Sequence, residues 1–92
     1  MDKYKKKTIP HALRILVWDK YIGKKIGEAK CKCCEKINIL QLSFECGHII
    51  SEFHGGETNV DNLLPICSTC NNSMGTENFY VFKEKLKKFA KK

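Results

Sequence analysis

The sequence has no long apolar run. The longest one near the start is Ile15-Leu16-Val17-Trp18, far short of the roughly 20 residues that a membrane-spanning helix needs. The basic stretch 1–7 is not followed by the apolar region of a secretory signal. We therefore expect no membrane association, and an intracellular, reducing compartment such as the cytoplasm or the nucleus.

Arginine is nearly missing as well. Arg14 is the only arginine among the 17 Lys+Arg, which outnumber the 10 Asp+Glu and give a formal charge of +7. Lysine lacks the planar fork that reads guanine through two hydrogen bonds, so we expect little recognition of base sequence.

The positive charge is concentrated in two flanks. Residues 1–30 carry +6 and residues 76–92 carry +4, whereas residues 31–75 carry −3. Basic flanks suit a polyanion such as DNA, bound by sequence-nonspecific phosphate contacts. The alternative is that the lysines only keep a small domain soluble. The candidate contact residues are Arg14, Lys5, Lys6, Lys7, Lys24, Lys25, Lys85 and Lys88.

The length of 92 residues predicts a single domain, 1–92, without repeats or a low-complexity linker. Residues 1–7 are expected to form a flexible basic arm. Apolar residues at helical spacing then predict a helix over 9–21, with Thr8 as its cap and Pro10 in its first turn. A polar loop is expected at 24–30.

The rest of the chain mixes strand and helix patterns. The β-branched and aromatic content of 37–50 favours strands, and the following stretch 51–61 is expected to be loop. A short helix is predicted from Cys67 to a stop at Gly75. A last helix over 76–91, capped by Thr76, carries an apolar face of Phe79, Phe82, Leu86 and Phe89. The fold class is therefore α+β with flanking N- and C-terminal helices.

Four of the six cysteines form two Cys-x-x-Cys pairs, Cys31/Cys34 and Cys67/Cys70. Two such pairs predict a closed Cys₄ site for a structural Zn²⁺, which would supplement the small core of a chain this short. Cys33 is an alternative ligand to Cys34, and Cys46 is expected to be a buried small residue. A three-disulfide framework is the alternative use of the cysteines.

Between the cysteine pairs lies the stretch Phe44-Glu45-Cys46-Gly47-His48-Ile49-Ile50, followed by Gly55-Gly56, Asp61-Asn62-Leu63 and Cys67-x-x-Cys70-Asn71. Over roughly residues 31–75 this order and spacing resemble the HNH endonuclease family, which has the ββα-metal fold. The Leu-Arg-x-x-Val-Trp helix and the Ser-Met-Gly-Thr turn are similar to small stand-alone versions found in phages and large DNA viruses. For such a viral protein the compartment would be the host cell.

The resemblance implies a role for each polar residue between the cysteines. His48 corresponds to the general base that activates water. Asn62 corresponds to the asparagine that braces the loop aiming the histidine. Asn71 corresponds to a ligand of a catalytic divalent ion, Mg²⁺ or Mn²⁺, distinct from the zinc. The implied activity is metal-dependent hydrolysis of DNA phosphodiester bonds.

Gly47 departs from the family pattern, because many relatives place Asp or His there as a second metal ligand. Glu45 shares strand parity with position 47 and is the first substitute, although a solvated carboxylate is the more ordinary role for it. Asn72 and Asp61 are weaker substitutes. The alternative function is therefore a non-catalytic, zinc-stabilised nucleic-acid-binding module. The sequence leaves a monomer and a homodimer equally open.

Overall fold

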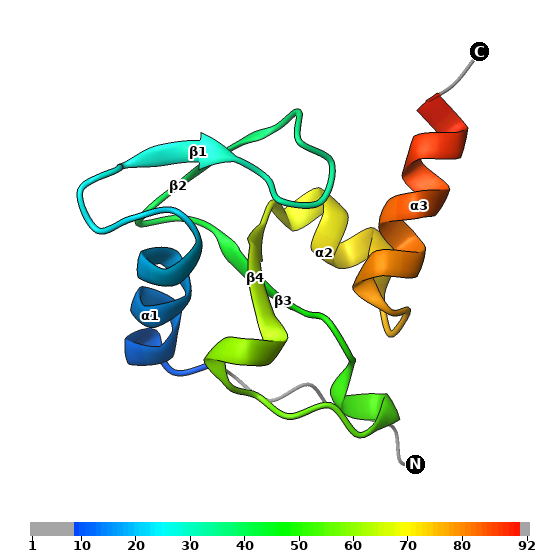
Figure 1. Cartoon of the computed structure of the whole chain (residues 1–92), viewed down its shortest axis with the longest axis horizontal. Helices are drawn as coiled ribbons and strands as arrows, with labels where there is room; N and C mark the ends of the chain where they lie inside the picture. Colours follow the sequence, from blue (N-terminus) through cyan, green and yellow to red (C-terminus); the bar gives the residue numbers. More distant parts are fainter. Residues whose placement is uncertain (1–8, 91–92) are drawn as a thin grey trace.

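The computed structural model describes residues 9–90, which form helices and two small antiparallel sheets (Figure 1). The α+β class is therefore confirmed. Among the described residues, none of the helices has the length and apolar character needed to cross a membrane. In chain order the elements are α1 (His11–Tyr21), β1 (Glu28–Lys30), β2 (Asn38–Leu40), β3 (Glu45–His48), β4 (Leu63–Ile66), α2 (Ser68–Met74) and α3 (Phe79–Ala90).

The centre of the molecule is the antiparallel pair β3–β4 (Figure 1). Glu45 pairs with Ile66, and His48 pairs with Leu63. Every residue of β4 is buried, so this strand lies within the core. Its third residue is Pro65, and the sequence did not predict a strand there. The strand tolerates proline because, among residues 9–90, β4 pairs with β3 alone and Pro65 lies on an edge strand.

The second sheet, β1–β2, corrects the polar loop expected at 24–30. Strand β1 pairs with β2 in the register Glu28 to Leu40, Ala29 to Ile39 and Lys30 to Asn38. Only the middle residue of β1 turns inward, toward the buried Ile39. A strand of three residues with one small apolar position carries no periodic signal that sequence reasoning could use.

Helix α1 begins at His11, two residues later than expected, with Pro10 as its N-cap. Its inner face buries Val17 and Trp18. The Trp18 indole Nε1–H donates to the carbonyl of Ile26 at 2.8 Å, and its ring centre lies 5.0 Å from that of Phe44. Helix α1 thereby packs beside β4 and closes one side of the core. The predicted basic arm 1–7 and the Thr8 cap lie outside the described residues.

Helix α3 begins at Phe79 rather than at residue 76. The side-chain oxygen of Asn78 accepts hydrogen bonds from the backbone N–H groups of Tyr80 and Val81, so Asn78 replaces Thr76 as the cap. Phe79 and Phe82 are buried, but Phe89 is 76% exposed. The predicted apolar face therefore packs on the core at Phe79 and Phe82 but not at Phe89, because the C-terminal half of α3 extends past the rest of the molecule (Figure 1).

The connection between β3 and β4 turns tightly at Gly56. The backbone N–H of Gly56 donates to the carbonyl of Ser51 at 2.8 Å. A Cβ at this position would lie 1.8 Å from the carbonyl oxygen of Ile50 and 2.9 Å from Nδ2 of Asn62. Both neighbours are fixed by backbone geometry or hydrogen bonds, so only glycine fits here.

We predict that Gly56→Ala destabilises the protein by about 2–3 kcal/mol, since the added methyl must push backbone apart. The matched control is Gly27→Ala, because a Cβ at Gly27 meets no atom within 4 Å. Urea unfolding at a fixed zinc concentration measures both free energies of unfolding. Equal losses in the two variants would contradict the prediction.

Candidate active site and metal centre

Four cysteine sulfurs form a compact cluster. The Sγ atoms of Cys31, Cys34, Cys67 and Cys70 all lie within 4.8 Å of one another, and three of these residues are buried. In a tetrahedral site with Zn–S bonds of about 2.3 Å, neighbouring sulfurs are roughly 3.8 Å apart. The donor set and its spacing therefore fit zinc, and the predicted ligand set is confirmed as a cluster that can hold it. Cys33 and Cys46 are not part of the cluster.

Backbone groups already orient the sulfurs. The N–H groups of Cys33 and Cys67 donate to Sγ of Cys31 at 3.3 and 3.2 Å, and the N–H of Cys70 donates to Sγ of Cys67 at 3.4 Å. Burial alone would raise the pKa of Cys34, but hydrogen bonds from the backbone of Ile37 and Lys36 and with the side chains of Cys31 and Cys70 together outweigh it and lower this pKa to about 7. Such bonds favour thiolates, the form that binds metal.

Burial prevails at the other end of the cluster, where it raises the pKa of both Cys67 and Cys70. Protons therefore compete with metal for these two thiols, and a bound cation must displace them. Separately, burial raises the pKa of Cys46 to about 11. This residue is 2% exposed and behaves as the buried small side chain that the sequence predicted.

Contacts around the cluster join three segments. The N–H of Lys32 donates to the carbonyl of Pro65 at 3.1 Å, which ties the first cysteine pair to β4. The Lys83 ammonium donates to the carbonyl of Lys32 and to the carboxylate of Glu35, both at 2.7 Å. Lys83 thus fastens α3 to the same loop. No pattern in the sequence singles out this lysine, because it is one of many in a basic helix.

His48 is the last residue of β3 and is 6% exposed. Its Nε2 lies 2.9 Å from the hydroxyl oxygen of Thr58. The Thr58 hydroxyl donates to the carboxylate of Glu52, and Oε2 of Glu52 is 3.8 Å from the same Nε2. Sequence reasoning missed Thr58 and Glu52, because the path of the chain after β3, which the sequence pattern does not encode, brings them to His48.

Asn62 fastens this loop at both ends. Its side-chain oxygen accepts from the N–H of Ile50 at 2.9 Å. Its amide Nδ2 donates to the carbonyls of Ile50 and Glu57, each at 2.8 Å. The backbone of Asn62 also accepts from the N–H of Ile49 at 2.8 Å. These bonds hold the two ends of the segment 50–57, which carries Glu52 and is followed directly by Thr58. A residue that braces the loop around His48 would make bonds of this kind.

Helix α2, which carries Asn71, packs against β3. A Cβ at Gly47 would lie 3.4 Å from the methyl of Met74 and 2.3 Å from Cδ1 of Ile66. Met74 therefore covers position 47, and Asn71 lies one helical turn before Met74 on the same face of α2. The place next to His48 is filled by apolar side chains, which leaves no room for a longer residue at 47 without repacking.

The three substitutes for a ligand at 47 lie in different surroundings. Glu45 is half-buried on the same strand face as Gly47 and lines a groove with Cys67 and Ser68, at the start of α2. Asp61 pairs with Lys20 at 2.9 Å and is 83% exposed. Asn72 is exposed. Glu45 is therefore the one that lies on the strand of His48 and lines a groove with the start of the helix of Asn71.

A comparison with models of protein families shows the family to which this segment belongs. The model of the HNH endonuclease family matches residues 31–77, which is 47 of the 92 residues. The chain belongs to the HNH endonuclease family. No curated protein and no solved structure matches it significantly. The matched segment holds the cysteine cluster, His48 and Asn71, and membership implies a nucleic-acid substrate.

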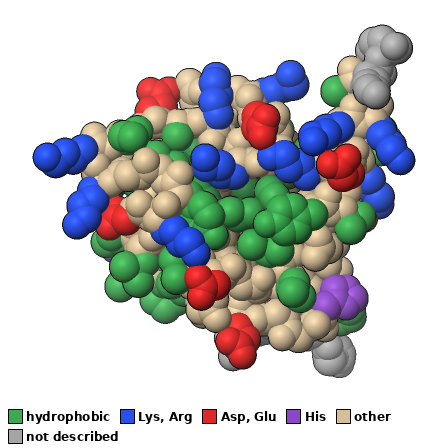
Figure 2. Space-filling view, in the orientation of Figure 1, with side chains coloured by type: hydrophobic (Ala, Val, Ile, Leu, Met, Phe, Trp, Pro, Cys, Tyr) green, Lys and Arg blue, Asp and Glu red, His purple; other side chains and the backbone are tan. Residues whose placement is uncertain are grey.

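The residues predicted to contact phosphate lie outside the segment that the HNH model matches, and they differ in their exposure and in their partners. Lys24, Lys25, Lys85 and Lys88 are exposed. On the face in Figure 2, cationic side chains lie above and to both sides of a central apolar area, with acidic side chains among and below them. Lys85 is paired with Glu77 at 2.6 Å. Lys5, Lys6 and Lys7 lie outside the described residues.

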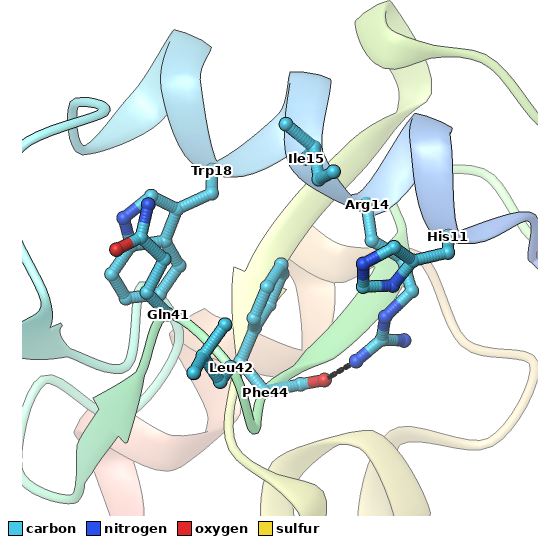
Figure 3. Close-up of a pocket in the computed structure, with 7 residues that line it drawn as sticks. All are labelled: His11, Arg14, Ile15, Trp18, Gln41, Leu42 and Phe44. Atoms are coloured by element: carbon cyan, nitrogen blue, oxygen red, sulfur yellow. Dashed lines mark hydrogen bonds between the residues drawn. The ribbon is translucent and has the colours of Figure 1, made fainter.

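Arg14 is held within the protein itself. Its guanidinium donates to the carbonyl of Phe44 and lies 4.9 Å from the centre of that ring. Figure 3 shows it on one wall of a pocket of about 260 Å³ that α1 forms with the segment after β2. Because the guanidinium bonds to the carbonyl of Phe44 and stacks on its ring, Arg14 helps to pack α1 against the segment before β3.

We predict that Cys70→Ser lowers bound zinc from one ion per chain to near zero and lowers the melting temperature, since three sulfurs hold the ion far less tightly. The matched control is Cys33→Ala, a buried cysteine outside the cluster. Elemental analysis and thermal unfolding, with and without a chelator, measure both effects. A zinc content of one in the Cys70→Ser variant would contradict the assignment.

Proposed function

We propose that the protein is a metal-dependent endonuclease that hydrolyses DNA phosphodiester bonds. His48 acts as the general base, and Asn71 is a ligand of a catalytic Mg²⁺ or Mn²⁺. The cysteine cluster holds a separate, structural Zn²⁺. The observation that carries the proposal is that α2, which begins at the cysteine cluster, packs on the strand that ends in His48.

Each residue does a distinct part of the work. The imidazole of His48 removes a proton from the attacking water, a task that suits a side chain with a pKa near neutrality. Asn62 holds the loop around His48 in place through its bonds to Ile50 and Glu57. Asn71, with Glu45 as the second candidate, offers oxygen ligands of the kind that Mg²⁺ prefers. The bound cation would neutralise the phosphate and stabilise the leaving oxygen.

The apolar packing around Gly47 favours one second candidate, a nucleic-acid-binding module without catalysis. In that case the basic surface would bind DNA, but the missing ligand at 47 would leave the divalent ion too weakly held to work. The two functions differ in a single measurable property, which is cleavage under conditions where binding is complete.

We predict that the protein nicks plasmid DNA with Mg²⁺ or Mn²⁺ and not with EDTA. His48→Ala and Asn71→Ala should each slow nicking at least about a hundredfold, because general base catalysis and the metal each contribute that much or more. His11→Ala, which changes an exposed histidine of α1, should nick at the wild-type rate. DNA ligase should seal the nicks if they carry 5′-phosphate and 3′-hydroxyl ends.

All variants must keep their zinc and their melting temperature for this comparison to count. Complete DNA binding with no cleavage under either metal would reject the nuclease and favour the binding module. Nicking that persists unchanged in His48→Ala would reject the assigned base.

We also predict that DNA binding weakens steeply as salt rises, because lysine–phosphate contacts release counterions. Lys88→Gln should reduce the slope of log affinity against log salt by about one, the value for one lost phosphate contact. Lys36→Gln is the control, since Lys36 is exposed within the acidic centre of the chain. An unchanged slope in Lys88→Gln would remove α3 from the DNA-binding surface.

A further inference from the structure

Two side chains outside the recognised motif contact the proposed base. Thr58 Oγ1 lies 2.9 Å from Nε2 of His48, and Glu52 accepts the proton of the Thr58 hydroxyl. The imidazole is 4% exposed and the Glu52 side chain is 14% exposed. The three groups therefore form a chain of hydrogen bonds that is largely shielded from solvent.

The direction of these bonds fixes where the imidazole proton sits. A carboxylate has only acceptors, and a threonine hydroxyl has one proton to donate. Because Thr58 gives its proton to Glu52, its oxygen must accept from His48. The neutral imidazole then carries its hydrogen on Nε2, and the lone pair that can take a proton lies on Nδ1.

The loop that carries these two groups is itself held rigidly. Asn62 binds it at Ile50 and Glu57, on either side of Glu52 and immediately before Thr58. Gly56 closes it against Ser51 with no space for a side chain. The position of Thr58 relative to His48 is therefore set by the backbone and not by a mobile side chain alone.

We infer that Thr58 and Glu52 are positioning residues for the nuclease, which hold His48 as the Nε2–H tautomer and present Nδ1 as the proton acceptor. When Nδ1 takes the proton from water, the ring becomes a cation, and the carboxylate of Glu52 stabilises it from 3.8 Å. The logic is that of a base oriented by a third group. This inference rests on the proposed function.

The test compares Thr58→Val with Thr58→Ser, which respectively remove and keep the hydroxyl at nearly constant size. Nitrogen-15 NMR of the His48 ring reads the tautomer directly and requires no nuclease activity. We expect the wild type and Thr58→Ser to show a protonated Nε2, and Thr58→Val to show a mixture or the other tautomer. Nicking should fall about ten- to a hundredfold in Thr58→Val and recover in Thr58→Ser.

Glu52→Gln should slow nicking by a similar factor, whereas Glu57→Gln, an exposed carboxylate of the same loop, should not. Thr76→Val is the matched control for Thr58→Val, because Thr76 is exposed. Zinc content and melting temperature establish that each variant is folded.

The tautomer and the nicking rate separate the two proposals. An unchanged His48 tautomer in Thr58→Val, or an unchanged nicking rate in that variant, overturns the positioning role while the nuclease remains. A wild-type protein that never nicks overturns the nuclease, and the tautomer comparison still decides whether Thr58 and Glu52 set the proton on His48.

Discussion

The cysteine cluster is the constraint on which the rest of the structure depends. It joins the loop at Cys31 and Cys34 to the start of α2, across more than thirty residues of sequence. A helix of seven residues is far too short to be stable by itself. Its direction is fixed at one end by Cys67 and Cys70, and at the other end Met74 packs over Gly47. The residue proposed to bind the catalytic ion, Asn71, lies between these two fixed points.

The surroundings of His48 show how a polar ring is kept inside a small protein. Burying an imidazole without partners would cost several kcal/mol. Here the loop between β3 and β4 folds back and supplies Thr58 and Glu52, and Asn62 satisfies the backbone of that loop. Polar groups that would each be costly alone therefore satisfy one another.

Sequence reasoning succeeded where the signal is local and chemical. The spacing of Cys31, Cys34, Cys67 and Cys70 is enough to predict the cluster, because a metal fixes ligand geometry. The family could be identified for the same reason. The roles of His48, Asn62 and Asn71 remain predictions, since the structure gives their placement and not their chemistry.

Sequence reasoning failed where tertiary contacts decide the outcome. The partners of His48 come from a loop whose path depends on Asn62 and Gly56. Strand β4 exists despite Pro65, because burial and pairing with β3 override the low strand propensity of proline. The exposure of Phe89 follows from how far α3 extends, which the helical spacing of its apolar residues does not encode.

Pro65 also limits how β4 can pair. An unpaired strand edge can accept a strand from another molecule. On β4 that edge offers no amide hydrogen at residue 65, and the carbonyl there already accepts from the N–H of Lys32. Because β4 is also buried along its whole length, the same proline that makes this segment look unlike a strand leaves no backbone group at this position for such a pairing.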